Sequence, residues 1–201
     1  MRNKFAPNRR AVILGLASSA VLVPGVSFAI TEAQARALIG KVVDEVNAII
    51  NSGKPETAMY ADFEALFAKY GDVPIIARSS LGVAWRSATS NQQTAYVAAF
   101  RSYMASKYGA QFHKFKDGKI EVTGAKSYQK GFLVNSMAYL KGSAPFTVDW
   151  QVSDQSGQDK MFNLYIEGIS LLATERTEIA AMLDRRGGNL DLLIKDLKTA
   201  N

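Results

Sequence analysis

Residues 146–172, FTVDWQVSDQSGQDKMFNLYIEGISLL, contain the clearest β-hairpin pattern in the chain. In the first half of this stretch apolar and polar side chains alternate, and a period of two places the apolar set on one face of a strand. Residues 154–158 form the turn, where Gly157 can adopt a positive φ. The return strand has Phe162, Leu164 and Ile166 on one face, and Met161 and Tyr165 on the other. A strand that is apolar on both faces indicates cover on both sides, which a hairpin exposed to solvent does not need.

The chain before this hairpin has helical periodicity. Thr31 with Gln34 predicts a capping box at the start of a long amphipathic helix that ends at residues 51–53. A second helix follows Pro55 and ends at Gly71.

A short helix after Pro74 and a linker interrupted by glycine, which carries Trp85, come next. Ser90 with Gln93 predicts a capping box for a third long helix, which we expect Gly109 to interrupt.

The pattern changes at Gly118, where short runs of β-branched and aromatic residues replace the helical period. We predict strands at 119–123 and 132–140, followed by the two strands of the hairpin. Helical periodicity returns at 174–184, and Asn189 caps a last helix. The sequence therefore predicts an α+β fold: a curled antiparallel four-stranded sheet packed with helices around an apolar cavity, an NTF2/cystatin-like arrangement. The apolar stripes are also consistent with a filled core that has no cavity.

The first 29 residues have the pattern of a cleaved secretory signal. Basic residues at 2, 4, 9 and 10 precede an uncharged apolar run at 11–23, and Ser27-Phe28-Ala29 supplies a small-x-small cleavage site. The run is shorter than the ~20 residues that a membrane span needs. The adjacent Arg9 and Arg10 also resemble a twin-arginine signal, although ordinary signals carry such pairs too. We expect residues 30–201 to be exported as a single domain.

Removal of the signal changes the charge of the chain. The four basic residues lost leave 20 Lys and Arg against 18 Asp and Glu, a net charge of +2 in place of +6. A nearly neutral domain argues against nucleic acid as a partner. The chain has no cysteine, which excludes disulfides, thiolate metal sites and a lipoprotein anchor.

Motifs for catalysis are largely missing. His113 is the only histidine, which excludes metal sites built from several histidines, and there is neither a P-loop nor a dinucleotide-binding glycine motif. Asp149, Glu167 and Glu175 could pair in a cleft, although their spacing does not require it. We therefore expect a protein that is not an enzyme and uses no metal or cofactor.

Several segments together resemble the MlaC family of periplasmic phospholipid-binding proteins, also called toluene-tolerance auxiliary proteins. They are IIARSSLGVAWRSATSNQQTAYVAAFRSYM at 75–104, VDWQV at 148–152, IEGISLL at 166–172, Arg176, and GGNLDLLIKDLK at 187–198. Two departures indicate a divergent branch: Gln158-Asp159-Lys160 replaces a tryptophan usual before the last strand, and Glu175-Arg176 replaces a tyrosine-arginine pair.

The resemblance implies a periplasmic shuttle that binds a phospholipid as its ligand. Such a protein carries lipid between an inner-membrane ABC transporter complex of the Mla type and an outer-membrane lipoprotein complex, and maintains outer-membrane lipid asymmetry. Exposing two chains of about fifteen methylenes to water costs on the order of 20 kcal/mol at ~0.8 kcal/mol per methylene, so a carrier must enclose the tails.

We expect the tails to contact apolar residues of the strands and of the helical stripe that faces them. These are Val83, Phe100, Met104, Val134, Val148, Trp150, Leu164, Ile166, Ile169 and Leu172. Arg86 and Arg176 are the candidates for a head-group phosphate, because a guanidinium matches phosphate geometry. Salt bridges from these arginines to Asp149, Glu167 or Glu175 are an equally good explanation.

Two other functions stay open. One is a carrier of another apolar lipid such as a hopanoid. The other is a small α+β hydrolase or isomerase that uses His113 and a buried carboxylate, for which Glu167 is a candidate.

Overall fold

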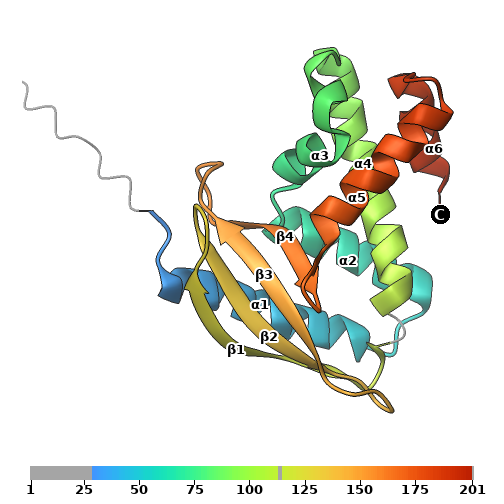
Figure 1. Ribbon diagram of the computed structural model, residues 1–201. Helices are drawn as coiled ribbons and strands as arrows, with labels where there is room; N and C mark the ends of the chain where they lie inside the picture. Colours follow the sequence, from blue (N-terminus) through green and yellow to red (C-terminus); the bar gives the residue numbers. More distant parts are fainter. Residues whose placement is uncertain (1–28, 113–114, 201) are drawn as a thin grey trace, which may run out of the picture.

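A computed structural model describes residues 29–112 and 115–200. In this part of the chain six α-helices accompany one antiparallel sheet, an α+β fold (Figure 1). The signal at 1–29, apart from Ala29, and His113 lie outside the described residues. No helix within the described ranges is long and apolar enough to span a membrane.

The first two helices begin and end as predicted. α1 (Glu32–Ile50) starts with the expected capping box, in which the Gln34 backbone N–H donates to Thr31 Oγ1 and the Thr31 N–H donates to Gln34 Oε1. α2 (Glu56–Tyr70) follows Pro55 and ends at Gly71. Both helices follow the chain's local signals, because caps and breakers act within one turn.

The next segment departs from the predictions at two points. α3 (Val73–Leu81) leads into a 3-10 helix, η1 (Gly82–Arg86), and then into α4 (Ser90–Phe112). The capping box of α4 is formed by Thr89 and Gln92, one residue earlier than predicted. The predicted interruption at Gly109 is wrong, because α4 continues through it. A Cβ at Gly109 would lie 2.6 Å from the Tyr60 ring, so this glycine allows α2 and α4 to approach closely.

The sheet has five strands in sequential order, not the four predicted, and it is open. The strands are β1 (Lys119–Ser127), β2 (Phe132–Tyr139), β3 (Phe146–Ser153), β4 (Lys160–Ile166) and β5 (Ile169–Ser170). β5 is only two residues long, which is too short for a period of two to reveal it. α5 (Leu171–Arg185) follows it directly, and Asn189 caps α6 (Leu190–Thr199) as expected.

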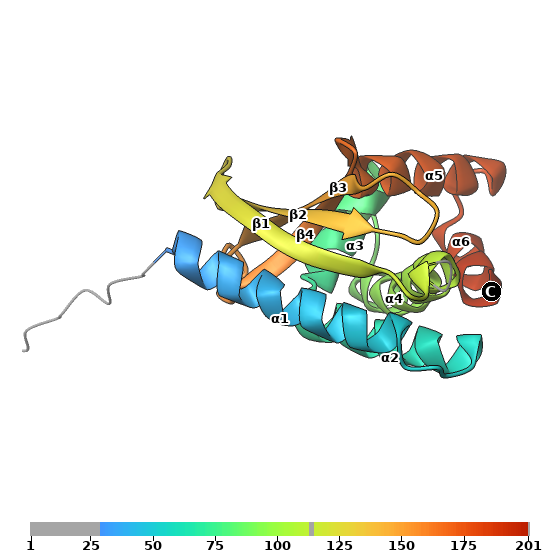
Figure 2. The same cartoon turned by 90° about the horizontal axis from the view of Figure 1, so that it is seen from below.

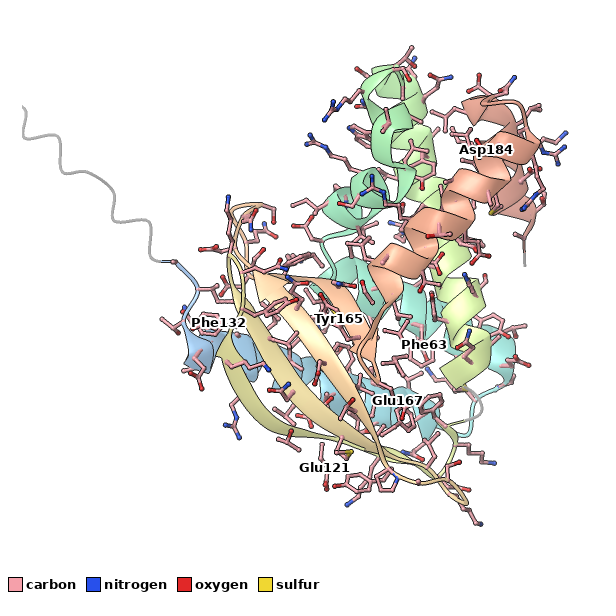
Figure 3. The ribbon with its side chains drawn as sticks, in the orientation of Figure 1. Phe63, Glu121, Phe132, Tyr165, Glu167 and Asp184 are labelled. Atoms are coloured by element: carbon pink, nitrogen blue, oxygen red, sulfur yellow. The ribbon has the colours of Figure 1, made fainter. Side chains whose placement is uncertain are left out.

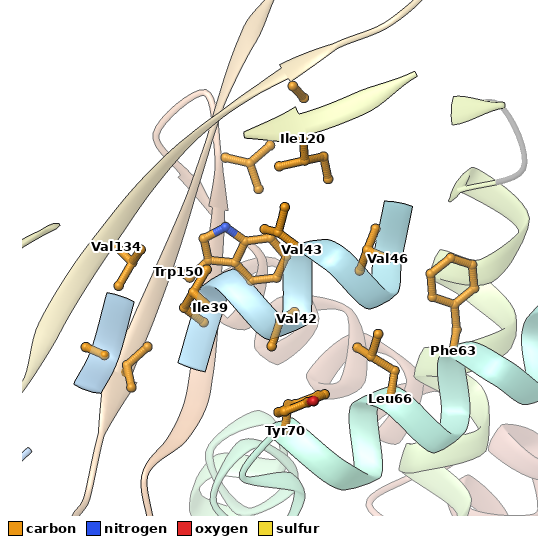
Figure 4. Close-up of a cluster of buried hydrophobic side chains, with 14 of the residues drawn as sticks. Ile39, Val42, Val43, Val46, Phe63, Leu66, Tyr70, Ile120, Val134 and Trp150 are labelled. Atoms are coloured by element: carbon orange, nitrogen blue, oxygen red, sulfur yellow. The ribbon is translucent and has the colours of Figure 1, made fainter. Parts of the chain in front are cut away.

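The apolar interior is divided between two clusters. The first, the sheet-side core, joins the sheet to α1 and α2, and α1 runs along one face of the sheet (Figure 2). Its side chains interdigitate around Trp150 (Figure 4). Its members are Ile30, Ala35, Ile39, Val42, Val43, Val46, Ile50, Met59, Phe63, Leu66, Tyr70, Ile120, Val134, Ala138, Val148, Trp150 and Val152.

The second cluster, the helical core, is built from α3, α4, α5 and α6, which gather beyond β4 (Figure 1). Its members are Ile76, Ala77, Leu81, Tyr96, Ala99, Phe100, Tyr103, Ile179, Leu190, Leu193, Ile194 and Leu197. A chain of this size usually forms one contiguous core. The two separate clusters leave a boundary between them inside the protein.

Candidate functional site

An apolar pocket of about 140 Å³ lies where the sheet-side core meets the helical core. Residues of both clusters line it, from α1, α2, α3, α4, α5 and the strands β1, β3 and β4. Nearly all of them are aliphatic or aromatic. They are Val46, Phe63, Leu66, Phe67, Ile76, Met104, Ala105, Tyr108, Gly109, Gln111, Phe115, Ile120, Phe146, Val148, Trp150, Met161, Phe162, Asn163, Leu164, Ile166, Leu171, Leu172 and Glu175.

An irregularity in β4 allows this strand to serve both clusters. Gln151 pairs with Asn163 and Val152 pairs with Met161, so Phe162 is the extra residue of a bulge. Met161 packs on the sheet-side core and Phe162 on the helical core, yet both line the pocket. The simple alternation predicted for this strand is therefore wrong at Met161 and Phe162, because Met161 shares the sheet-side core with Leu164 whereas Phe162 packs on the helical core.

Trp150 turns an apolar ring toward the pocket because its polar atom is satisfied elsewhere. Its Nε1–H donates to Ser136 Oγ at 2.9 Å, and the Ser136 hydroxyl donates to the Val148 carbonyl. Ser136 is itself buried. The indole therefore presents hydrocarbon without leaving a buried donor unpaired.

Six of the ten residues expected to contact acyl tails lie together around the pocket. They are Met104, Val148, Trp150, Leu164, Ile166 and Leu172. The full inner row of the hairpin, Val148, Trp150, Leu164 and Ile166, is among them.

The other four do not line the pocket. Phe100 and Val134 are fully buried inside the helical and sheet-side cores, respectively. Val83 is 77% exposed in η1, and Ile169 is 65% exposed in β5. Sequence periodicity does not separate a residue that fills a core from one that faces a pocket, and a short irregular segment has no period to read.

The two candidate head-group arginines are both exposed and do not line the pocket. A Cβ at Gly82 would lie 3.5 Å from Arg176 Nε, so Arg176 packs against the junction of α3 and η1. Among the described residues neither Arg86 nor Arg176 forms an ion pair with Asp149, Glu167 or Glu175.

Those three carboxylates have different surroundings. Asp149 accepts a hydrogen bond from Asn135 Nδ2 at 2.9 Å. Glu167 is exposed in the turn after β4, with φ 50° (Figure 3). Only Glu175 is buried, at 0% exposure. The carboxylate suggested for a hydrolase, Glu167, therefore does not meet the requirement of burial.

A polar cluster that sequence reasoning missed borders the pocket between α4 and α5. Glu175 Oε1 accepts hydrogen bonds from Lys107 Nζ at 2.6 Å and from the Tyr108 hydroxyl at 2.5 Å. Lys107 also donates to Glu178, which accepts from the Tyr103 hydroxyl as well, at 2.9 Å. The spacing of Glu175 and Glu178 places both on one face of α5, which was the one signal in the sequence.

The surroundings in the cluster raise the pKa values of Lys107, Tyr103 and Tyr108. Burial is the largest single influence on Lys107 and lowers its pKa, but the hydrogen bonds to Glu175 and Glu178 together outweigh it, and the pKa of Lys107 lies above its usual range. Burial and the hydrogen bond to Glu175 raise the pKa of Tyr108, and burial raises the pKa of Tyr103 to about 12. Lys107 is therefore an ammonium and both phenols are neutral near pH 7.

One atom of this cluster has no partner. Glu175 Oε2 is buried and accepts no hydrogen bond from any described residue. A buried acceptor left unsatisfied costs about 1–3 kcal/mol, and more when the group is charged. Within the described ranges no group of three His, Cys, Asp or Glu side chains could hold a metal ion.

The pocket can accept apolar groups of limited size. A cavity of ~150 Å³ lined by aliphatic and aromatic side chains holds a benzene-sized molecule. A full acyl chain needs more volume than this pocket provides. The lining of the site offers burial of hydrocarbon.

Comparison with known proteins gives this arrangement a context. The fold matches that of the phospholipid-binding protein from Ralstonia solanacearum, solved in complex with a phospholipid, with a TM-score of 0.70 and 20% sequence identity over 83% of this chain and 96% of that one. The family model described as MlaC protein matches residues 40–199. The match spans every strand, the helical core and most of the sheet-side core, and the chain belongs to the MlaC family.

Proposed function

We propose that the mature chain is a periplasmic phospholipid carrier rather than an enzyme. It would hold the acyl tails of its ligand in the pocket between the two cores and exchange that ligand between an inner-membrane ABC transporter complex and an outer-membrane lipoprotein complex. This traffic would maintain the lipid asymmetry of the outer membrane.

The observation that carries the proposal is the apolar pocket at the boundary of two separate cores. Its wall is hydrocarbon apart from a few polar groups, and it lies between two units that are each already packed. Family membership supports lipid transport, and the bound phospholipid of the Ralstonia protein supports the choice of ligand. Burial of two acyl chains contributes on the order of 20 kcal/mol, which is enough to compete with a bilayer.

The exposed arginines suit a head group that remains at the surface. Arg176 and Arg86 are not paired with the nearby carboxylates considered above, so both can contact a phosphate without first breaking those pairs. We therefore keep Arg86 and Arg176 as the proposed head-group residues, with the tails between the cores.

Lipid extraction and mass spectrometry of the mature protein, purified from the periplasm, test the proposal directly. We expect a copurifying phospholipid in about equimolar amount. Absence of lipid, together with no uptake from phospholipid vesicles, would contradict it.

A matched pair of variants tests whether the pocket is the binding site. Leu164→Gln places an amide in the wall, and desolvating it costs about 1–3 kcal/mol, so we expect uptake from vesicles to weaken about tenfold. Leu192→Gln is the control, because Leu192 is half exposed on α6 and lies outside the pocket. Equal uptake by the two variants would place the lipid elsewhere.

The rival enzymatic function has its own test. His113→Ala and Glu167→Gln should leave lipid uptake and transfer between vesicles unchanged. Loss of transfer in either variant, with the fold intact by circular dichroism, would favour the hydrolase or isomerase.

A further inference from the structure

Glu175 carries an unpartnered carboxylate oxygen at the edge of the pocket. The side chain is fully buried, lines the pocket, and has its two oxygens in different situations. Oε1 is held by Lys107 and Tyr108, whereas Oε2 has no donor within reach among the described residues.

The other residues that line the pocket do not donate to Oε2, although Gln111 on α4 carries an amide. The neighbours of Glu175 along α5 that line the pocket are Leu171 and Leu172, and on α4 Met104 and Ala105 are apolar. Asn163, a further polar group of the wall, is engaged with Ser170 and with the backbone N–H of Leu172. No described residue donates to Oε2, so its donor would be a bound molecule, either a ligand in the pocket or a water.

Charge and polarity limit which donor this can be. A head-group ammonium is tied to a phosphate, and the surrounding hydrocarbon could not solvate that phosphate. An uncharged hydroxyl needs only one acceptor, is small, and can be attached to an otherwise apolar chain. Lys107 pairs with the buried Glu175, and the second carboxylate of the cluster, Glu178, is 43% exposed to solvent, so the ligand does not need to supply a positive charge.

We propose that Glu175 Oε2 is a specificity site that accepts a hydrogen bond from a hydroxyl carried by the lipid, in the part that enters the pocket. The inference rests on the proposed lipid-binding function and narrows it to hydroxyl-bearing lipids as preferred ligands. Such a hydroxyl has two sources: the free glycerol hydroxyl of a lysophospholipid, or a hydroxylated acyl chain.

The test compares ligands that differ only in the donor. 1-Decanol and its methyl ether displace a fluorescent phospholipid from the mature protein, and we expect the alcohol to bind about tenfold more tightly because the ether has no hydrogen to donate. Equal affinity overturns the inference, and this is also the result expected if a water molecule satisfies Oε2. The comparison uses the unmodified protein, so it does not depend on a variant that folds.

Two variants then assign the effect to the residue. Glu175→Leu removes the acceptor and should abolish the preference for the alcohol. Glu178→Gln is the control. It changes the other carboxylate that Lys107 contacts, but Glu178 lies outside the pocket, so the tenfold preference should persist. A preference that survives Glu175→Leu contradicts the assignment.

Two further ligand pairs identify the source of the hydroxyl. Lysophosphatidylcholine is compared with its 2-O-methyl ether, and a phospholipid with a hydroxystearoyl chain is compared with its stearoyl counterpart. Selectivity in the first pair supports the proposal with the glycerol hydroxyl as donor, and selectivity in the second supports it with the acyl hydroxyl.

Uptake of an ordinary diacyl phospholipid is measured on the same samples. Uptake without any preference for hydroxyl overturns the specificity site alone. Failure to take up any phospholipid contradicts the proposed function itself.

Discussion

Trp150 and Ser136 lie on neighbouring strands, and the indole Nε1–H donates to the Ser136 hydroxyl at 2.9 Å. Both side chains are buried, and the hydroxyl passes the bond on to the carbonyl of Val148. This chain of bonds holds the ring against the pocket while keeping its polar atom away from it.

Replacing Ser136 with Ala should destabilise the protein by about 1–3 kcal/mol, because the indole N–H then has no acceptor in a buried site. The free energy of unfolding in urea, followed by circular dichroism, measures the loss. In a Trp150→Phe background the same substitution should cost less, since no donor remains to be satisfied. Equal costs in the two backgrounds would mean that the bond contributes nothing.

Two helical glycines give opposite predictions for the same substitution. At Gly40, in α1, a Cβ meets nothing within 4 Å, so Gly40→Ala should stabilise by about 0.5–1 kcal/mol through helix propensity. At Gly109 the Cβ would lie 2.6 Å from Tyr60, so Gly109→Ala should destabilise by about 1–3 kcal/mol.

Thermal or urea unfolding of both variants decides between propensity and packing. Tyr60→Ala supplies the control, because with the ring removed Gly109→Ala should become stabilising. If Gly109→Ala is stabilising in the unmodified protein, then α2 and α4 are not as close as described.

Gly109 also shows where sequence reasoning stops. Signals that act within one turn, such as the box at Thr31 and the cap at Asn189, were predicted correctly because cause and effect lie within a few residues. Gly109 looks like a helix breaker locally. Its purpose depends on Tyr60, a residue 49 positions away in the chain that only the fold brings near.

The same limit explains which parts of the candidate site the sequence patterns did not predict. Alternation placed the inner row of the hairpin together, but it could not reveal the bulge at Phe162. Periodicity alone could not separate Phe100, which fills a core, from Met104, which lines the pocket. The Glu175 cluster depends on side chains of α4 that reach side chains of α5, and nothing in either helix predicts these contacts.

The interaction of Lys107 with Glu178 predicts a dependence of stability on pH. Burial acts to raise the pKa of Glu178, but the hydrogen bonds from Lys107 and Tyr103 outweigh it, so the pKa lies below the ordinary value of 4.5. A lowered pKa means that the bonds stabilise the fold above pH 4.5, and that this contribution is lost as the pH falls through the folded-state value. The carboxylate is 43% exposed, so solvent screening keeps the contribution small.

Urea unfolding of the unmodified protein and of Glu178→Gln, between pH 6 and pH 3, measures this contribution. The difference between their unfolding free energies should shrink as the pH falls. Tyr103→Phe removes one of the two donors. In a Tyr103→Phe protein the difference between the unfolding free energies should therefore decrease less as the pH falls. A difference that stays constant across the range would show that Glu178 is not held in its ionised form by these partners.

The two tryptophans allow the position of a bound lipid to be read directly. Trp150 lines the pocket, whereas Trp85 lies in η1, packs on the helical core and does not line it. Bromine on an acyl chain quenches indole fluorescence only at close range. In a Trp85→Phe protein, loading with a phospholipid brominated along its tails should therefore quench Trp150 strongly, while Trp85 in a Trp150→Phe protein should change little.

The unbrominated phospholipid corrects for any change that loading itself causes. Stronger quenching of Trp85 than of Trp150 would move the tails from the boundary between the cores to the surface around η1, where Val83 and Arg86 are exposed.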